Sequence, residues 1–364
     1  MKIVRAEYGP CIMRTEDPEW RFALAARRVS ESWIVALTSD EGVVGYGCSA
    51  RSPHMGSTMA TTEAAMREFL SRLEGRDPMD VEDVVRDMDA QLAGNYHAKA
   101  GIDVALYDLA AKSLGLPLYK LLGGKLRESV PILRILAIKS PDKMAENALL
   151  LMEKGYRYFK IKLHGEQKED VDRVRAIRKA VGDDIHLTID ANQSYNAKDA
   201  IRALNRMADF DIEIAEQPVP AGDLEGLKLV TDSVPMVVEA DESARTLEDV
   251  AVLTKGRIVD AITLKAPRFG GIRNTITAAR LCESANIRHR LGSAVGSRLL
   301  AATSIHLAVA LPGVSYACEL GEFDRLLDDP FEGIEIVNGS IALPSGAGCG
   351  VTPRPGALQN LTRC

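Results

Sequence analysis

The run Val237-Val-Glu-Ala-Asp241 decides the fold together with three similar runs, because each is short, apolar and closed by a charged residue. The other three are His186-Leu-Thr-Ile-Asp190, Asp211-Ile-Glu-Ile-Ala-Glu216 and Ile262-Thr-Leu-Lys265. Their charged ends follow one another at intervals of 26, 25 and 24 residues, which suits one strand and one returning helix. The four polar ends are therefore expected to converge at one mouth of a parallel barrel, where catalytic groups sit.

The chain from about residue 130 onward alternates between apolar runs and helical stretches. Eight strands are expected, at about 132–138, 157–163, 185–190, 212–216, 236–241, 260–265, 287–291 and 314–319. Seven helices are expected between them, at about 142–154, 168–181, 197–207, 223–231, 246–254, 271–285 and 297–310. Such alternation favours a closed α/β barrel of the TIM-like (β/α)7β type over an open sheet.

The first 125 residues follow a different pattern. A hairpin is expected at 32–47 around the turn Asp40-Glu-Gly42, and three helices are expected at 61–73, 80–92 and 98–114. Strands followed by helices indicate an N-terminal α+β capping domain over 1–125. The barrel is then expected over 126–325. The Gly- and Pro-rich segment 326–364 is expected to pack back on the capping domain.

Composition narrows the class of protein. The chain has 364 residues and a net charge of −6, with acidic and basic residues interspersed, so no nucleic-acid surface is expected. No apolar stretch approaches the roughly 18 residues of a membrane span, and the N-terminus shows no signal region. The six cysteines form no Cys-x-x-Cys pair. These features predict a cytoplasmic protein without membrane or nucleic-acid partners.

Two lysines are expected inside the barrel. In Tyr158-Phe-Lys-Ile-Lys-Leu163, Lys160 and Lys162 are two residues apart and share one face of the strand. Buried ammonium groups are costly unless anions offset them, and the next strand supplies Asp190.

The three carboxylates predict a metal site. Each of Asp190, Glu216 and Asp241, taken alone, is also compatible with helix capping or with a salt bridge to the lysines. Three carboxylates on consecutive strands repel one another unless a cation lies between them. A set of oxygen ligands without His or Cys selects a hard ion, Mg²⁺ before Mn²⁺.

Lys265 is expected to face Lys162 across that ion, because strand six lies roughly opposite strand two in an eight-stranded barrel. One ammonium group on each face of a bound substrate suits proton transfer. A nearby divalent cation and a second lysine both favour the neutral form of a lysine, which is the form that acts as a base. The alternative for Lys265 is an ion pair with Glu216 or Asp241.

These residues carry a resemblance that covers nearly the whole chain. The barrel signature of the enolase superfamily, specifically its muconate lactonizing enzyme subgroup, resembles Lys160-Ile-Lys162, Asp190-Ala-Asn192, Glu216-Gln-Pro218, Ala240-Asp-Glu-Ser243 and Lys265 with Gly270-Gly271 behind it. The stretches 98–108 and 115–124 are similar to the segment that joins the capping domain to the barrel in that superfamily.

The resemblance implies Mg²⁺-assisted removal of the proton α to a substrate carboxylate, giving an enediolate. Asp190, Glu216 and Asp241 would be the metal ligands, and Lys162 and Lys265 the acid/base pair. Lys160 would help hold the substrate carboxylate, and Asn192 and Gln217 would orient the site. The resemblance also points to a homo-oligomer such as an octamer.

Three positions bear on the subgroup. A mandelate racemase type would have a catalytic His after strand seven, whereas His289 lies inside that strand and is expected to be a satisfied buried residue. Many relatives carry a glutamate where this chain reads Gly292-Ser-Ala-Val-Gly296. Strand eight ends Cys318-Glu-Leu-Gly-Glu-Phe-Asp324, closer to the Thr-Glu-Leu-Phe-Gly ending of muconate cycloisomerases than to the Asp-x-Asp ending of dipeptide epimerases. Glu319 is expected to touch Lys265 or the substrate, or to cap a loop.

Specificity is expected from two loops of the capping domain. Residues 16–30 contain Trp20, Arg21 and Phe22, and residues 51–56 contain Arg51, His54 and Met55. Trp20 and Arg51 are the predicted substrate contacts. Long loops over a barrel are commonly lids, although a surface loop without that role fits too. Arg134 on strand one would indicate a second anionic group on the substrate if it faced inward.

The leading specific reaction is cycloisomerisation of a muconate-like diacid. The alternatives are racemisation or epimerisation of N-substituted amino acids or dipeptides, and dehydration of an acid. Two readings of other classes are a metal-independent lyase that forms a Schiff base on Lys162 or Lys265 and a non-catalytic barrel.

Overall fold

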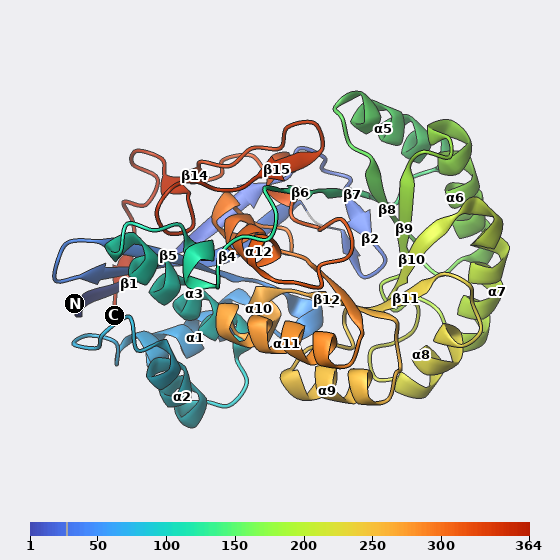
Figure 1. Ribbon diagram of the computed structural model, residues 1–364. Helices are drawn as coiled ribbons and strands as arrows, with labels where there is room; N and C mark the ends of the chain where they lie inside the picture. Colours follow the sequence, from blue (N-terminus) through green and yellow to red (C-terminus); the bar gives the residue numbers. More distant parts are fainter. Residues whose placement is uncertain (27) are drawn as a thin grey trace.

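The computed structural model describes residues 1–26 and 28–364. Seven strands form one parallel sheet in the order β13-β12-β11-β10-β9-β8-β7, which curls with the helices on its outer side (Figure 1). Their bounds are β7 Leu133–Leu136, β8 Tyr158–Lys162, β9 His186–Asp190, β10 Ile212–Glu216, β11 Val237–Ala240, β12 Ala261–Leu264 and β13 Arg288–Leu291. The first seven predicted strands are confirmed.

Residues 314–319, the predicted eighth strand, do not form a regular strand. They make isolated parallel bridges instead, from Cys318 to Ile132 and from Glu319 to Gly292. The Cys318 amide donates to the Pro131 carbonyl at 3.0 Å and the Glu319 amide donates to the Leu291 carbonyl at 3.0 Å. These contacts connect β13 to the chain just before β7, so the barrel is closed as a modified (β/α)7β barrel.

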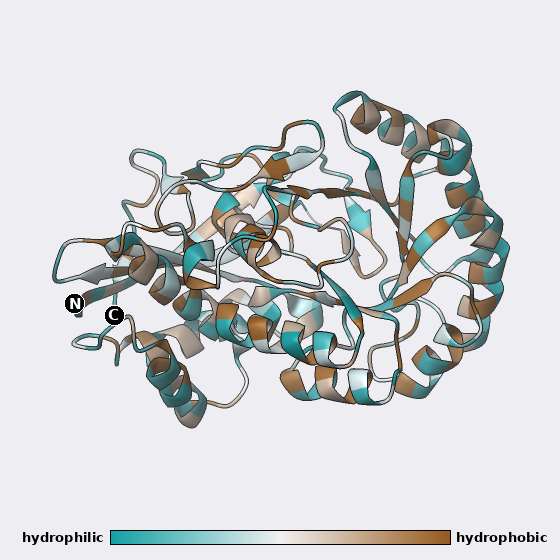
Figure 2. Cartoon of the chain, viewed as in Figure 1, coloured by the Kyte–Doolittle hydropathy of each residue, from teal (hydrophilic) through white to brown (hydrophobic). Residues whose placement is uncertain are grey.

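The barrel helices begin and end within one residue of the predicted bounds. They are α5 Pro141–Glu153, α6 Gln167–Val181, α7 Ala197–Met207, α8 Leu224–Thr231, α9 Leu247–Lys255, α11 Ile272–Ser284 and α12 Arg298–Ala310. Their apolar positions face the strands, and Figure 2 shows hydrophobic segments along the strands with mixed colours on the surrounding helices. A further short helix, α10 Ala266–Phe269, directly follows β12 and was not predicted.

The N-terminal part is an α+β layer that covers one side of the barrel. Its antiparallel sheet has the order β17-β1-β4-β5, with β1 Ile3–Arg14, β4 Val29–Ser39, β5 Val44–Ala50 and β17 Thr362–Arg363. Its helices are α1 Met59–Leu70, α2 Val81–Gln91 and α3 Tyr96–Ser113. The hairpin and helices were expected, whereas β1 was not, because Gly9 and Pro10 interrupt its apolar alternation.

Glycines allow α3 to lie directly on β5. A Cβ atom added at Gly47 would lie 1.8 Å from the Gly101 carbonyl oxygen, and one at Gly45 would lie 2.4 Å from the Ala105 carbonyl oxygen. Because no other residue lacks a Cβ, this close contact depends on glycine. It positions the end of β5, and hence Arg51 and Ser52, at the barrel mouth.

The C-terminal segment contacts both parts of the chain. Strand β17 pairs with β1, and β15 (Ser340–Ala342) pairs with β6 (Ser129–Pro131) beside the barrel. A small sheet of β14 (Phe331–Glu332) and β16 (Thr352–Pro353) lies between them along the chain. The predicted boundaries at 125 and 325 stay a prediction.

Two sequence expectations concern the environment of the protein. All six cysteines are free thiols. In the described part of the chain, no helix is both long enough and apolar enough to cross a membrane. The cytoplasmic location stays a prediction.

Candidate active site

The two lysines of β8 lie inside the barrel, as their spacing predicted. Lys160 is 1% exposed and its Nζ lies 2.9 Å from Glu216 Oε2 and 3.6 Å from Asp190 Oδ2. Lys162 is 5% exposed, donates to Asp190, and lies 3.1 Å from Asn192 Oδ1. Both buried ammonium groups therefore have carboxylate partners, which offset the cost of removing them from water.

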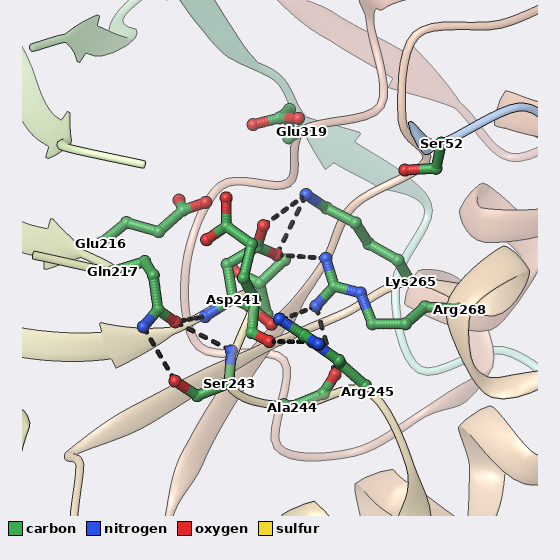
Figure 3. Close-up of polar contacts among 12 residues, drawn as sticks. Ser52, Glu216, Gln217, Asp241, Ser243, Ala244, Arg245, Lys265, Arg268 and Glu319 are labelled. Atoms are coloured by element: carbon green, nitrogen blue, oxygen red, sulfur yellow. Dashed lines mark hydrogen bonds and ion pairs between the residues drawn. The ribbon is translucent and has the colours of Figure 1, made fainter. Parts of the chain in front are cut away.

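The three acidic strand ends lie on neighbouring strands. Asp190 and Glu216 are register partners of β9 and β10, and Asp241 directly follows β11. All three carboxyl groups are buried. Asp241 accepts from Arg268 at 2.7 Å and lies 3.0 Å from Lys265 Nζ (Figure 3).

The charges of these groups are strongly interdependent. Burial raises the pKa of the Glu216 carboxyl to about 8, and the negative charges of Asp190 and Asp241 act in the same direction. Burial also acts to raise the pKa of Asp190, but Lys162 and Lys160 bring it below its ordinary value. Arg268 and Lys265 likewise hold the pKa of Asp241 well below its usual range against the effect of burial. The acids are therefore held at unequal pKa values by the cations around them.

The donor chemistry of this cluster fits a hard cation, since three buried carboxylates from adjacent strands supply oxygen ligands only. The negative charges of Asp190 and Asp241 raise the pKa of Glu216, and a divalent ion bound by the three carboxylates would relieve this repulsion. In the arrangement seen here, however, their oxygens face lysine and arginine side chains. Among the described residues, no group of three or more His, Cys, Asp or Glu side chains is set to hold a metal. The residues fit the ion, but they would have to turn toward it.

Lys265 reaches Asp241 from the opposite side of the barrel, at the residue before α10. Its strand β12 is separated from β8 by three strands of the sheet. A Cβ atom added at Gly292 would lie 2.7 Å from Lys265 Cε, so the side chain crosses a space that only glycine leaves open. Gly292 opens the segment where a glutamate was expected in many relatives, and here it makes room for Lys265.

The charge of Lys265 differs from the sequence expectation. Burial lowers the pKa of its ammonium group, but Asp241 and Glu319 outweigh burial, and the pKa lies above its ordinary value. The expected neutral form depends on a divalent cation that would draw Asp241 away from the ammonium group. The ion pair with Asp241 that was considered as the alternative for Lys265 is present.

A cavity of about 710 Å³, measured out to its open side, lies above these groups. Its floor consists of residues at the strand ends and is made of Lys162, Asn192, Asp241, Glu242, Lys265 and Glu319. Its outer wall comes largely from the capping domain and includes Trp20, Phe22, Arg51, Ser52, His54 and Met55. Both predicted specificity loops therefore reach the cavity, and so do the predicted substrate contacts Trp20 and Arg51.

Two amides fix the backbone around the acids. Gln217 Oε1 accepts from the amides of Asp241 and Ser243, both at 3.0 Å, and its Nε2 donates to Ser243 (Figure 3). Asn192 accepts from Lys162 and donates to Glu242 at 3.1 Å. Both side chains thus hold the loops that carry the acids, which is the orienting arrangement expected of them.

Three charged residues of this network were not singled out from the sequence. Arg268 on α10 binds Asp241, and Arg290 on β13 donates to Glu216 at 2.6 Å and also to Glu239 on β11. Arg290 and Glu239 are almost fully buried. The signal was alternation within the strand, since Arg290 lies two residues before Gly292 and Glu239 two residues before Asp241.

Glu319 forms its ion pair with Lys160, and its expected contact with the substrate stays a prediction. The positive charges of Lys160, Lys265 and Lys162 hold its pKa far below the ordinary value although burial opposes this. Glu319 lines the cavity floor. It therefore adds a fourth carboxylate to the lysine cluster.

Arg134 and His289 lie outside the cavity lining. Arg134 pairs in register with Phe159, on the other strand face from Lys160, and donates to the Gly321 carbonyl at 2.7 Å. Arg134 therefore does not face inward, and it gives no indication of a second anionic group on the substrate. His289 is fully buried, but among the described residues neither ring nitrogen has a hydrogen-bond partner, so it is not the satisfied histidine that was expected.

Comparison with protein families matches both parts of the chain. Residues 12–123 match the N-terminal domain of mandelate racemase / muconate lactonizing enzyme proteins. Residues 143–357 match the enolase C-terminal domain-like family. Together these matches extend over most of the sequence.

The individual relatives are named either as epimerases or as cycloisomerases. The chain is 36% identical over 339 residues to an L-Ala-D/L-Glu epimerase of Clostridium acetobutylicum, covering 91% of this chain and 94% of that protein. It is 33% identical over 343 residues to a chloromuconate cycloisomerase of Cupriavidus necator, covering 92% of each. A solved dipeptide epimerase from Enterococcus faecalis, complexed with Mg and L-Leu-L-Tyr, superposes with a TM-score of 0.93 at 34% identity, covering 97% of this chain and 100% of that one.

Proposed function

Because the chain belongs to the mandelate racemase / muconate lactonizing enzyme family of the enolase superfamily and is an isomerase of that family, we propose that it is a Mg²⁺-dependent racemase or epimerase. Its substrate would be an α-amino acid carboxylate substituted on nitrogen, either an N-acyl amino acid or a dipeptide. The single observation that carries this proposal is the placement of Lys162 and Lys265 on opposite sides of one cavity.

The relatives favour this reading over the muconate cycloisomerisation that the sequence put first. The epimerase of Clostridium acetobutylicum is more similar to this chain than the cycloisomerase of Cupriavidus necator, at 36% against 33% identity. The ending Cys318-Glu-Leu-Gly, on which the preference for cycloisomerisation depended, places Glu319 against Lys160. A carboxylate that pairs with Lys160 affects the charge of the lysine cluster, and it does not favour lactone formation over another reaction. The metal-independent lyase and the non-catalytic barrel are also less favoured, since the relatives are isomerases.

Proton transfer would use one lysine on each face of the substrate. The neutral lysine on one side takes the proton from the α-carbon, and the resulting enediolate is planar at that carbon. The ammonium group on the other side then returns a proton to the opposite face, which inverts the stereocentre. A positioned acid or base of this kind contributes about 10²–10⁴-fold to the rate.

Lys160 would bind the substrate carboxylate. Its ammonium group lies among Glu216, Asp190 and Glu319, and a positive charge there would help to offset the negative charge that the enediolate gains. Trp20 and Arg51 would contact the part of the substrate that lies outside the floor.

Asp190, Glu216 and Asp241 would hold Mg²⁺, with Mn²⁺ as a substitute. When bound, the ion supplies positive charge that stabilises the enediolate and lowers the free energy needed to remove the α-proton. The Mg in the solved complex of the Enterococcus faecalis dipeptide epimerase supports this assignment. A homo-oligomeric assembly remains part of the proposal.

The test is α-proton exchange in D₂O, followed by NMR over N-acyl amino acids, dipeptides and muconate-like diacids. We expect exchange and inversion with amino-acid derivatives, loss of both with a chelator, and recovery on adding Mg²⁺. Lactone formation from a diacid without exchange into any amino-acid derivative would contradict the proposal and restore the cycloisomerase.

A further inference from the structure

Arg290 lies deeper in the barrel than the acids of the mouth and holds one of them. Its Nη2 atom donates to Glu216 Oε2 at 2.6 Å and to Glu239 Oε2 at 2.5 Å, and its Nε donates to Thr263 Oγ1 at 3.5 Å. Arg290 is 1% exposed, and Glu239 is fully buried. Neither belongs to the described residues that line the cavity, so their connection to the site is Glu216.

The register of the sheet brings the two carboxylates together. Glu216 on β10 pairs with Glu239 on β11, and Arg290 on β13 pairs with Thr263 on β12. Two carboxylates side by side in the interior of a protein repel each other strongly. A guanidinium group that bonds to both offsets this repulsion. Glu216 and Glu239 therefore share one donor nitrogen.

Glu216 would have to give up part of its contacts in order to bind a metal ion. Its Oε2 atom faces two cations, Lys160 at 2.9 Å and Arg290 at 2.6 Å. A buried cation that loses its carboxylate partner is strongly destabilising. Each of these cations has a second carboxylate, since Lys160 also pairs with Glu319 and Arg290 also pairs with Glu239. Both cations would thus stay paired when Glu216 turns toward an ion.

We propose that Glu239 is a positioning residue of the metal site: it keeps Arg290 paired and thereby frees Glu216 to bind Mg²⁺. This inference rests on the proposed function, in which Glu216 is one of three metal ligands. Without the Glu239 carboxylate, Glu216 is the remaining partner among the ion pairs that the structure describes for Arg290. Arg290 then competes with the ion for Glu216, so the ion binds more weakly.

The first test is Mg²⁺ binding to the protein without substrate, measured by isothermal titration calorimetry. We expect Glu239→Gln to raise the dissociation constant for Mg²⁺ at least tenfold, because Arg290 then holds Glu216 alone. Glu213→Gln is the matched control, since it removes the same charge from a partly exposed side chain of β10. Its dissociation constant should equal that of the unmodified protein.

A second variant separates the ion pair from general damage to the barrel. Arg290→Met combined with Glu239→Gln removes the competing cation together with its partner, so we expect Mg²⁺ affinity to return to within threefold of the unmodified protein. A second substitution in the core would not repair a fold that the first had damaged. A double variant that binds Mg²⁺ at least tenfold more weakly than the unmodified protein overturns the inference.

Glu239→Asp separates the contact from the charge. This variant keeps the negative charge but is one methylene shorter, so its carboxylate withdraws from Arg290. We expect at least a fivefold loss of Mg²⁺ affinity. An unchanged affinity in Glu239→Asp, beside a weakened one in Glu239→Gln, would show that only the distant charge matters and that the inference is wrong. If Glu239→Gln does not fold, Glu239→Asp and the double variant decide.

Failure of the inference and failure of the proposed function give different results. If the unmodified protein binds no Mg²⁺, or binds it equally well in Asp241→Asn, the assignment of the three acids as metal ligands is contradicted and the inference is overturned with it. If Asp241→Asn abolishes binding while Glu239→Gln leaves it unchanged, the metal site stands and only the role of Glu239 is refuted.

Discussion

The charge of a single lysine decides whether it can act as a base, and the two lysines of this cavity have different surroundings. Lys162 contacts Asp190 and Asn192, whereas Lys265 contacts Asp241 beside Arg268. Each is held by an acid that would also be a metal ligand. Proton transfer at either face is therefore expected to respond to the same ion.

Replacing each lysine separately should assign the two faces. We expect Lys162→Ala and Lys265→Ala each to lower exchange from one stereoisomer by about 10²–10⁴-fold, because a positioned base is lost. Exchange from the other stereoisomer should persist, and NMR in D₂O with both enantiomers measures this directly. Lys255→Ala, at an exposed position at the end of α9, is the control. Equal losses for both stereoisomers in both variants would argue against a two-lysine mechanism.

His289 is expected to make the fold sensitive to acid. Burial lowers the pKa of its ring to about 4, below its ordinary 6.5, and Arg127 and Arg280 act in the same direction against Glu283. The ring is neutral in the folded protein while the unfolded chain takes up a proton below about pH 6.5. Its stabilising contribution is thus complete above pH 6.5 and is lost as the pH falls toward 4.

His289→Leu should remove this loss. Between pH 6.5 and about 4, the free energy of unfolding of the unmodified protein should fall by up to about 1.4 kcal/mol per pH unit more than that of the variant. Urea denaturation at pH 7.5, 5.5 and 4.5 measures the difference. His186→Asn, at an exposed position on β9, should behave like the unmodified protein. Parallel pH profiles for His289→Leu and the unmodified protein would contradict the expectation.

At the scale of elements, the ends of β12 and β13 determine where the second lysine lies. Lys265 lies between the last residue of β12 and the first residue of α10, and its side chain passes over Gly292, which directly follows β13. Arg268 on the same short helix holds Asp241. One strand end, one short helix and one glycine therefore define this side of the cavity.

Gly292→Ala should displace Lys265 without unfolding the barrel. The added Cβ would lie 2.7 Å from Lys265 Cε, so the flexible lysine has to move. We expect at least a tenfold loss of exchange on the Lys265 face and a much smaller change on the Lys162 face. Gly222→Ala, where an added Cβ meets nothing within 4 Å, is the matched control. Losses of similar size on both faces would show a general disturbance of the site.

At the scale of the whole molecule, the cavity lies between the barrel and the capping layer. The capping layer supplies Trp20, Phe22 and Arg51, and the barrel supplies the lysines and acids. The repulsion among Asp190, Glu216 and Asp241 is spread over three strands of the sheet. A cation bound there would connect these strands and stabilise the fold as a whole.

Mg²⁺ should therefore raise the stability of the protein independently of any substrate. At a concentration 100 times its dissociation constant the ion adds about 2.7 kcal/mol to the free energy of unfolding. Thermal denaturation with and without Mg²⁺ at matched ionic strength measures the effect. Asp241→Asn should reduce it strongly, whereas Asp232→Asn, at an exposed position after α8, should not. Equal stabilisation in both variants would show that the ion binds elsewhere.

The sequence by itself determined the barrel, its helices and the inward lysines and acids. These features depend on local periodicity and on strand spacing, which place the same face or the same strand end toward the interior wherever the chain lies. The sequence also showed Gly292 in the segment where many relatives carry a glutamate. The interrupted strand β1 was missed, because Gly9 and Pro10 hide its alternation.

Only the tertiary structure decided which charges meet. Glu319 pairs with Lys160 rather than Lys265, Arg290 connects Glu216 to Glu239, and Arg134 turns away from the cavity. These partners lie far apart along the chain, and the strength of each pair depends on burial and on the distances between several charges at once. The order of residues along the chain gives neither the burial nor these distances. The chemistry of the outer wall therefore follows only from the folded molecule.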